Sequence, residues 1–64
     1  MKFNIIGVIA KSGTYIFDMQ AHYVPRLNEE LEINGTIYVV KYVRYQMGIG
    51  NFAVQNVKLG LEEK

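Results

Sequence analysis

The chain has no cysteine, one histidine and one proline among its 64 residues. Without cysteine, disulfides and cysteine-based zinc sites are excluded, and a single histidine, His22, argues against a histidine-rich metal site. A chain this short has room for one domain and buries only about 60% of the surface that its unfolded form exposes. Because 50% of its residues are hydrophobic, we expect a homo-oligomer in which a second copy supplies the missing burial.

Strong charge and long apolar runs are also lacking. The net charge is +1, which predicts no strong field toward nucleic acid or anionic lipid. No segment has the length of a membrane span. Lys2 precedes an apolar run, as in a signal peptide, but Asn4 interrupts that run and Lys11 ends it. We therefore expect a cytoplasmic protein with no membrane partner.

The residues that are present favour β-structure. Five tyrosines and three phenylalanines accompany many valines and isoleucines, whereas alanine, leucine and glutamine are scarce for a chain of this composition. Glycine residues and the Asn-Gly pair are turn signals, and they divide the chain into short segments of the length of strands. Five strands are predicted, over 2–9, 14–20, 31–33, 36–46 and from 52 to 59 or 61.

Alternation assigns the faces of the first two strands. The segment 2–9 is apolar on both faces, which indicates a strand that is central or covered by a partner chain. In the segment 14–20, Tyr15, Phe17 and Met19 are expected to point to one side and Asp18 to the other.

The middle of the chain carries the clearest local signals. Asn34-Gly35 between apolar runs predicts a type I′ turn that joins 31–33 to 36–46. Pro25 forces Val24 into an extended conformation and ends any ladder there. Pro25 can be interpreted as the first residue of a single helical turn, but we expect the segment 22–30 to be a loop that crosses one end of the domain.

Two strands lose their alternation. Tyr38 and Val40 share a face, but the next aliphatic residue, Val43, is three positions further on. A β-bulge near Lys41-Tyr42 would return Val43 to that face. The last strand shows the same irregularity, which predicts a second bulge near Gln55-Asn56, facing the first.

These patterns predict an all-β fold, a five-stranded antiparallel meander curled into a small SH3-like barrel with bulges and no substantial helix. The OB-fold is the second choice. The domain is expected to span 1–61, with 62–64 as a frayed tail.

The sequence offers little catalytic chemistry. Ser12, His22 and Asp18 can be written as a triad, but a turn serine, a loop histidine and a solvated aspartate explain them better. The carboxylates Glu29, Glu30 and Glu32 are expected to protect an edge strand from aggregation. The segment Gly48-Ile49-Gly50 is expected to be a hairpin loop, because a phosphate cradle would open a helix. We therefore expect no enzyme, no cofactor and no metal.

The preferred function is that of a non-catalytic interaction module that binds a protein or small ligand. One barrel interior cannot use apolar residues on both faces of its strands, and an exposed apolar patch usually marks an interface. The predicted interface residues are Ile6, Val8, Ile16, Ile37 and Val39. A one-residue error in register would make these residues core instead.

Single-stranded nucleic acid is the alternative partner. Small barrels that bind it present aromatic side chains interleaved with lysine and arginine. If Tyr42 and Arg44 face outward together with Lys58, they form a small basic-aromatic patch, to which Lys41 also belongs. The low net charge argues against general affinity, because phosphate contacts dominate such binding.

The segment VPRLNEELEINGTIYVVKYV, residues 24–43, resembles short β-barrel proteins that phages, prophages and mobile elements encode. Most of these proteins have no known function, and they include accessory factors that bind and inhibit host machinery. The resemblance therefore implies a genomic context of this kind more than an activity, and within it a phage-type accessory or inhibitor protein is the expected role.

Overall fold

The computed structural model describes residues 2–46 and 55–64. Within them the chain forms five strands and no helix: β1 (Phe3–Ile9), β2 (Tyr15–Ala21), β3 (Glu30–Ile33), β4 (Thr36–Gln46) and β5 (Gln55–Glu63). The all-β class and the five strands expected from the sequence are confirmed. The expected hairpin loop, including Gly48-Ile49-Gly50, and the expected start of the last strand at Phe52 lie outside the described residues.

The strands form one mixed sheet in the order β2-β1-β5-β4-β3. β1 pairs antiparallel with β2 and parallel with β5, whereas β5 with β4 and β4 with β3 pair antiparallel. The expectation of a purely antiparallel meander is therefore wrong. Hairpin signals specify only strands that follow one another, and β1 and β5 are brought together from opposite ends of the chain. β1 is a central strand, as its two apolar faces indicated.

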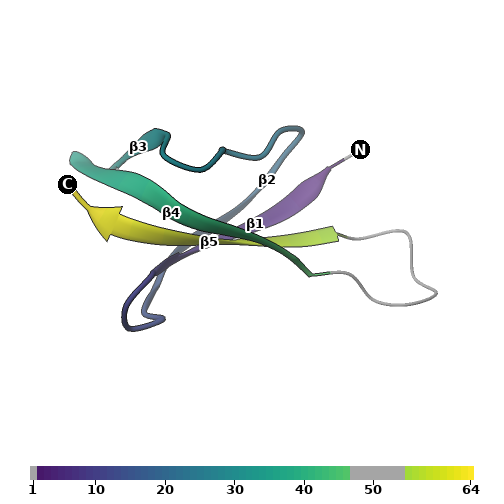
Figure 1. Ribbon diagram of the computed structural model, residues 1–64. Coiled ribbons are helices and arrows are strands. Elements are labelled where there is room, and N and C mark those ends of the chain that lie inside the picture. The colour runs from purple at the N-terminus through teal and green to yellow at the C-terminus, as the bar shows by residue number, and fades with distance from the viewer. Residues whose placement is uncertain (1, 47–54) are drawn as a thin grey trace.

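The sheet twists and curls into a half-barrel with β2 and β3 at its edges (Figure 1). No Cα atom of β2 lies within 8 Å of a Cα atom of β3. Paired strands lie only about 4.7–4.9 Å apart, so the two edges do not pair and the barrel stays open.

The core lies on the concave face. Cross-strand register places Ile5 of β1 beside Val57 of β5, and Val57 beside Tyr45 of β4. Burying one such aliphatic side chain contributes about 1.5–3 kcal/mol to folding. The buried cluster on this face consists of Ile5, Val40, Val57, Leu59 and Leu61.

The first predicted bulge is confirmed. Val40 pairs with Leu61 and Tyr42 with Gly60, so Lys41 is the extra residue in β4. The shift returns Val43 to the concave face opposite Leu59, where it packs against the core.

The second bulge lies in β2 instead of near Gln55-Asn56. From Gln55 onward β5 pairs with both neighbours without a shift. In β2, Gly7 pairs with Phe17 and Val8 with Tyr15, which leaves Ile16 as the extra residue. Tyr15 therefore joins Asp18 on the convex face and does not share the face of Phe17, because an inserted residue reverses the alternation.

Two local features, a turn and a strand end, complete the sheet. Asn34 and Gly35 have φ of 50° and 86°, the positive values that the expected type I′ turn requires. At the C-terminus β5 continues to Glu63, and the Lys64 N–H donates a hydrogen bond to the Ile37 carbonyl oxygen. Residues expected as a tail thus extend the ladder with β4.

Candidate functional site

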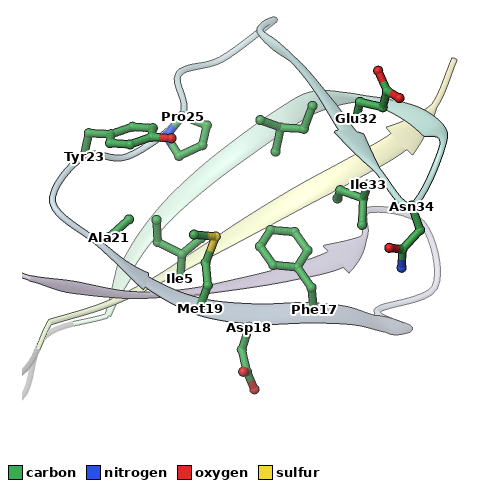
Figure 2. Close-up of a pocket in the computed structure, with 11 residues that line it drawn as sticks. Ile5, Phe17, Asp18, Met19, Ala21, Tyr23, Pro25, Glu32, Ile33 and Asn34 are labelled. Atoms are coloured by element: carbon green, nitrogen blue, oxygen red, sulfur yellow. The ribbon is translucent and has the colours of Figure 1, made fainter.

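The open side of the half-barrel contains an apolar groove. Its volume is about 490 Å³, and it lies between the edge strands β2 and β3. Phe17 and Met19 of β2 line one wall, Leu31 and Ile33 of β3 the other, and Ile5 of β1 lies in the floor. Figure 2 shows the side chains of Phe17, Met19 and Ile33 directed into the space between the strands.

The connection between β2 and β3 closes one end of the groove. Tyr23 and Pro25 lie at that end, opposite Asn34 in Figure 2. Pro25 is buried, whereas the Tyr23 side chain is 71% exposed. The connection has no helical turn, which confirms the expected loop.

Backbone hydrogen bonds fix this loop to β4. The Asn28 N–H donates to the Val40 carbonyl oxygen, and the Val40 N–H donates to the Glu29 carbonyl oxygen, both at 2.9 Å. Asn28 adopts φ of 72°, a conformation that asparagine tolerates better than most residues. The Glu29 carboxylate also accepts a hydrogen bond of 2.7 Å from the Arg26 N–H. The end wall of the groove is therefore held by specific contacts.

Carboxylates flank the groove on its outer side. Asp18 of β2 points away from the pocket in Figure 2, and Glu32 of β3 lies at the opposite rim. Glu30 shares the face of Glu32 and forms an ion pair with Lys64. Among the described residues, Asp18 and Glu32 have no ion-pair partner. The rim is therefore negatively charged although the chain carries net charge +1.

The convex face carries the basic-aromatic residues. Arg44 and Lys58 are direct cross-strand partners, and the Arg44 Cζ atom lies 5.1 Å from the centroid of the Tyr42 ring. Register therefore places Tyr42, Arg44 and Lys58 on one face. Lys41 is exposed at the bulge beside them.

A row of amide side chains crosses four strands beside this patch. The Asn4 amide donates to the Asn56 amide oxygen at 3.2 Å, and the Gln20 amide donates to the Asn4 amide oxygen at 3.1 Å. The register continues the row from β2 to β4 as Gln20, Asn4, Asn56 and Gln46.

The predicted interface residues do not form one patch. Ile6 and Val8 lie on β1, and β5 separates them from Ile37 and Val39 on β4. Val8 is only 4% exposed, and Ile16 packs against the core cluster as the bulge residue of β2. Of the predicted interface residues, Ile37 is the most exposed, with 41% of its surface accessible to solvent. Only part of this set is available for a contact with a second copy.

The catalytic triad that Ser12, His22 and Asp18 could form is not assembled. Ser12 lies in the turn before β2, where its hydroxyl oxygen is 2.7 Å from that of Thr14, and His22 follows the other end of the strand. In the part of the chain that the structure describes, no three histidine, aspartate or glutamate side chains form a group that could hold a metal ion. The same residues contain no helix long and apolar enough to cross a membrane.

Comparison of the chain with protein-family models, curated proteins and solved structures finds no match. The candidate sites therefore rest on the geometry described above.

Sequence reasoning missed the groove because it expected a closed barrel. Alternation places Phe17 and Met19 on a shared face, and a closed barrel would enclose that face. Met19 is 51% exposed, since β2 is an edge strand with no partner on its outer side within the described residues. Exposure of this kind depends on strand order, which alternation within one strand does not reveal.

Proposed function

We propose that the chain is a non-catalytic binding module that holds an extended polypeptide segment in the groove between β2 and β3. The observation that carries this proposal is the apolar groove of about 490 Å³ at the open side of the half-barrel. Exposed apolar surface of this kind usually marks a site of interaction. In this protein the surface is concave, and a fixed loop bounds one of its ends.

The walls of the groove favour a polypeptide over a compact ligand. Both walls are edge strands, and an edge strand presents backbone N–H and C=O groups that have no partner in its own sheet. An extended peptide can pair with such an edge while alternate side chains enter pockets. A small molecule would use the apolar lining but would leave the strand edges unpaired.

The SH3-like barrel and the phage-type role belong to this proposal. A strongly curved five-stranded sheet with a bulge in its longest strand supports the comparison with small barrels. The resemblance of residues 24–43 to phage-encoded proteins supports an accessory or inhibitory partner interaction. Neighbouring genes of phage or defence type would strengthen this part of the proposal.

Selection from a library of displayed random seven-residue peptides tests the groove, since β2 has seven residues. Peptides selected on the wild-type protein should bind the Met19→Lys variant at least about tenfold more weakly, because lysine replaces an apolar wall residue. Gln46→Lys is the matched control, since it adds the same charge on the convex face of β4, outside the lining of the groove. A failure to enrich any peptide, or equal binding to both variants, would contradict the proposal.

Single-stranded nucleic acid is a second candidate, favoured by the cross-strand pair of Arg44 and Lys58 beside the Tyr42 ring. Like charges placed directly opposite each other are unfavourable, and a phosphate between them would relieve the repulsion. Fluorescence anisotropy with a labelled oligothymidylate should show binding that weakens steeply with salt and falls on Arg44→Ala. Lys11→Ala, in the turn after β1, is the control for net charge. No binding at low salt would remove this candidate.

A further inference from the structure

We infer that the segment bound in the groove is a β-strand in which apolar side chains alternate with basic ones, and that it pairs with β2 and β3 to complete the barrel. The inference rests on the proposed function, because it presupposes a polypeptide in the groove.

The space between the two edges is open to an added strand, because β2 and β3 line one groove and do not pair with each other. β2 and β3 are more than 8 Å apart at every pair of Cα atoms, which excludes direct pairing. A strand between two others needs about 9.4–9.8 Å, twice the spacing of paired strands. The ladders make β2 antiparallel to β3, so an added strand would be antiparallel to one and parallel to the other. β1 already combines both kinds of pairing.

The inner face of the groove selects apolar side chains. Phe17 and Met19 reach it from β2, and Leu31 and Ile33 reach it from β3. Successive side chains of a strand point to opposite sides, so every second residue of the added strand faces this lining. A polar residue at those positions would lose its hydration without gaining a hydrogen-bond partner.

The outer face selects basic side chains. Residues of the added strand that point outward would lie between Asp18 of β2 and Glu32 of β3, both on the convex side of the sheet. Neither carboxylate has an ion-pair partner among the described residues, although the Tyr15 hydroxyl donates a hydrogen bond to Asp18, whereas Glu30 is paired with Lys64. An exposed cross-strand ion pair strengthens binding by up to about fivefold, and an acidic residue there would be repelled.

Three labelled peptides test the inference by fluorescence anisotropy against the full chain. Each has seven residues, the length of β2, and alternates valine with lysine, threonine or glutamate. We expect the lysine peptide to bind about tenfold more tightly than the threonine peptide, and the glutamate peptide to bind most weakly. A lysine peptide with methylated backbone nitrogens should not bind, because strand pairing needs N–H donors.

Two variants locate the charge effect. The double variant Asp18→Asn, Glu32→Gln should bind the lysine and threonine peptides equally, with the affinity for the threonine peptide unchanged. The matched control, Glu62→Gln with Glu63→Gln, removes two exposed carboxylates from β5 and should keep the preference for lysine.

Each alternative outcome is distinct. Equal binding of the three peptides, lost in Met19→Lys, would overturn the alternating basic pattern and leave the proposed function standing. No binding of any peptide would overturn the inference, and failure of the library selection as well would overturn the proposed function. Lysine-peptide binding that survives both Met19→Lys and backbone methylation would show charge attraction alone and overturn strand addition. A dimer that Met19→Lys dissociates would assign the groove to a second copy and also overturn it.

Discussion

The ring of Tyr42 lies directly over Gly60, its partner across the ladder between β4 and β5. A Cβ atom on Gly60 would overlap the edge of that ring. The absence of a side chain at Gly60 thus provides the place for the aromatic ring on the convex face. The same relationship holds between Gly7 of β1 and Phe17 of β2 on the concave face.

Gly60→Ala should destabilise the fold by about 1–3 kcal/mol, because the new methyl group displaces the Tyr42 ring. Chemical denaturation monitored by circular dichroism measures this loss. The Tyr42→Ala background is the control, since without the ring the added methyl group has room. A Gly60→Ala effect of equal size in both backgrounds would show that the ring is not the cause.

The bulge at Lys41 keeps β4 in register with the core. Because Lys41 is the extra residue, its deletion leaves Val40, Tyr42 and Val43 in strict alternation, still opposite Leu61, Gly60 and Leu59. We expect the deletion to keep the core and to change stability by less than about 1 kcal/mol, because no buried aliphatic side chain leaves the concave face. Lys41→Ala, which keeps the bulge and shortens only an exposed side chain, should change stability by less than about 0.5 kcal/mol. A loss on deletion as large as that of truncating a buried aliphatic side chain, about 2–5 kcal/mol, would contradict the assignment of Lys41 as the extra residue.

Local features of this fold could be predicted from the sequence, and long-range ones could not. Asn34-Gly35 and the loss of alternation after Val40 specify a turn and a bulge through nearby residues alone, and both are present. The parallel pairing of β1 with β5 depends on contacts between the two ends of the chain. No local pattern encodes such a contact.

The candidate sites follow the same division. The alternative patch requires Tyr42, Arg44 and Lys58 to share one face, and the structure brings them together there. The groove depends on which strands lie at the edges of the sheet. The bulge in β2 also escaped prediction, because Tyr15, Ile16 and Phe17 are all apolar or aromatic and alternation does not mark the inserted residue.

Tyr15 should titrate abnormally. Its hydroxyl donates a hydrogen bond of 2.9 Å to the Asp18 carboxylate, and this bond, with the carboxylate charge, raises the pKa of Tyr15 above its ordinary value. The bond favours the protonated phenol in the folded state. Its contribution to stability is therefore present below the unfolded pKa and is lost as the pH rises through the folded pKa.

Titration of Tyr15 by nuclear magnetic resonance measures this effect. In Asp18→Ala the pKa of Tyr15 should fall back toward the ordinary value, because both the acceptor and the negative charge are gone. Gln20→Ala, two positions further along β2, should leave the pKa of Tyr15 unchanged. A Tyr15 pKa that is the same in wild type and Asp18→Ala would contradict the assigned hydrogen bond.

Self-association of the chain stays a prediction, and the structure narrows the residues that it can use. Val8 is already buried in the single chain, so Ile37 and its neighbour Val39 are the better candidates for a contact between copies. Size-exclusion chromatography with light scattering should show a dimer or larger species at micromolar concentration. Ile37→Glu should weaken that association at least about tenfold, because a carboxylate would have to lose its hydration in the contact. Ile37→Val keeps the apolar surface and should associate as the wild type does. A wild-type chain that elutes as a monomer at every concentration would contradict the prediction.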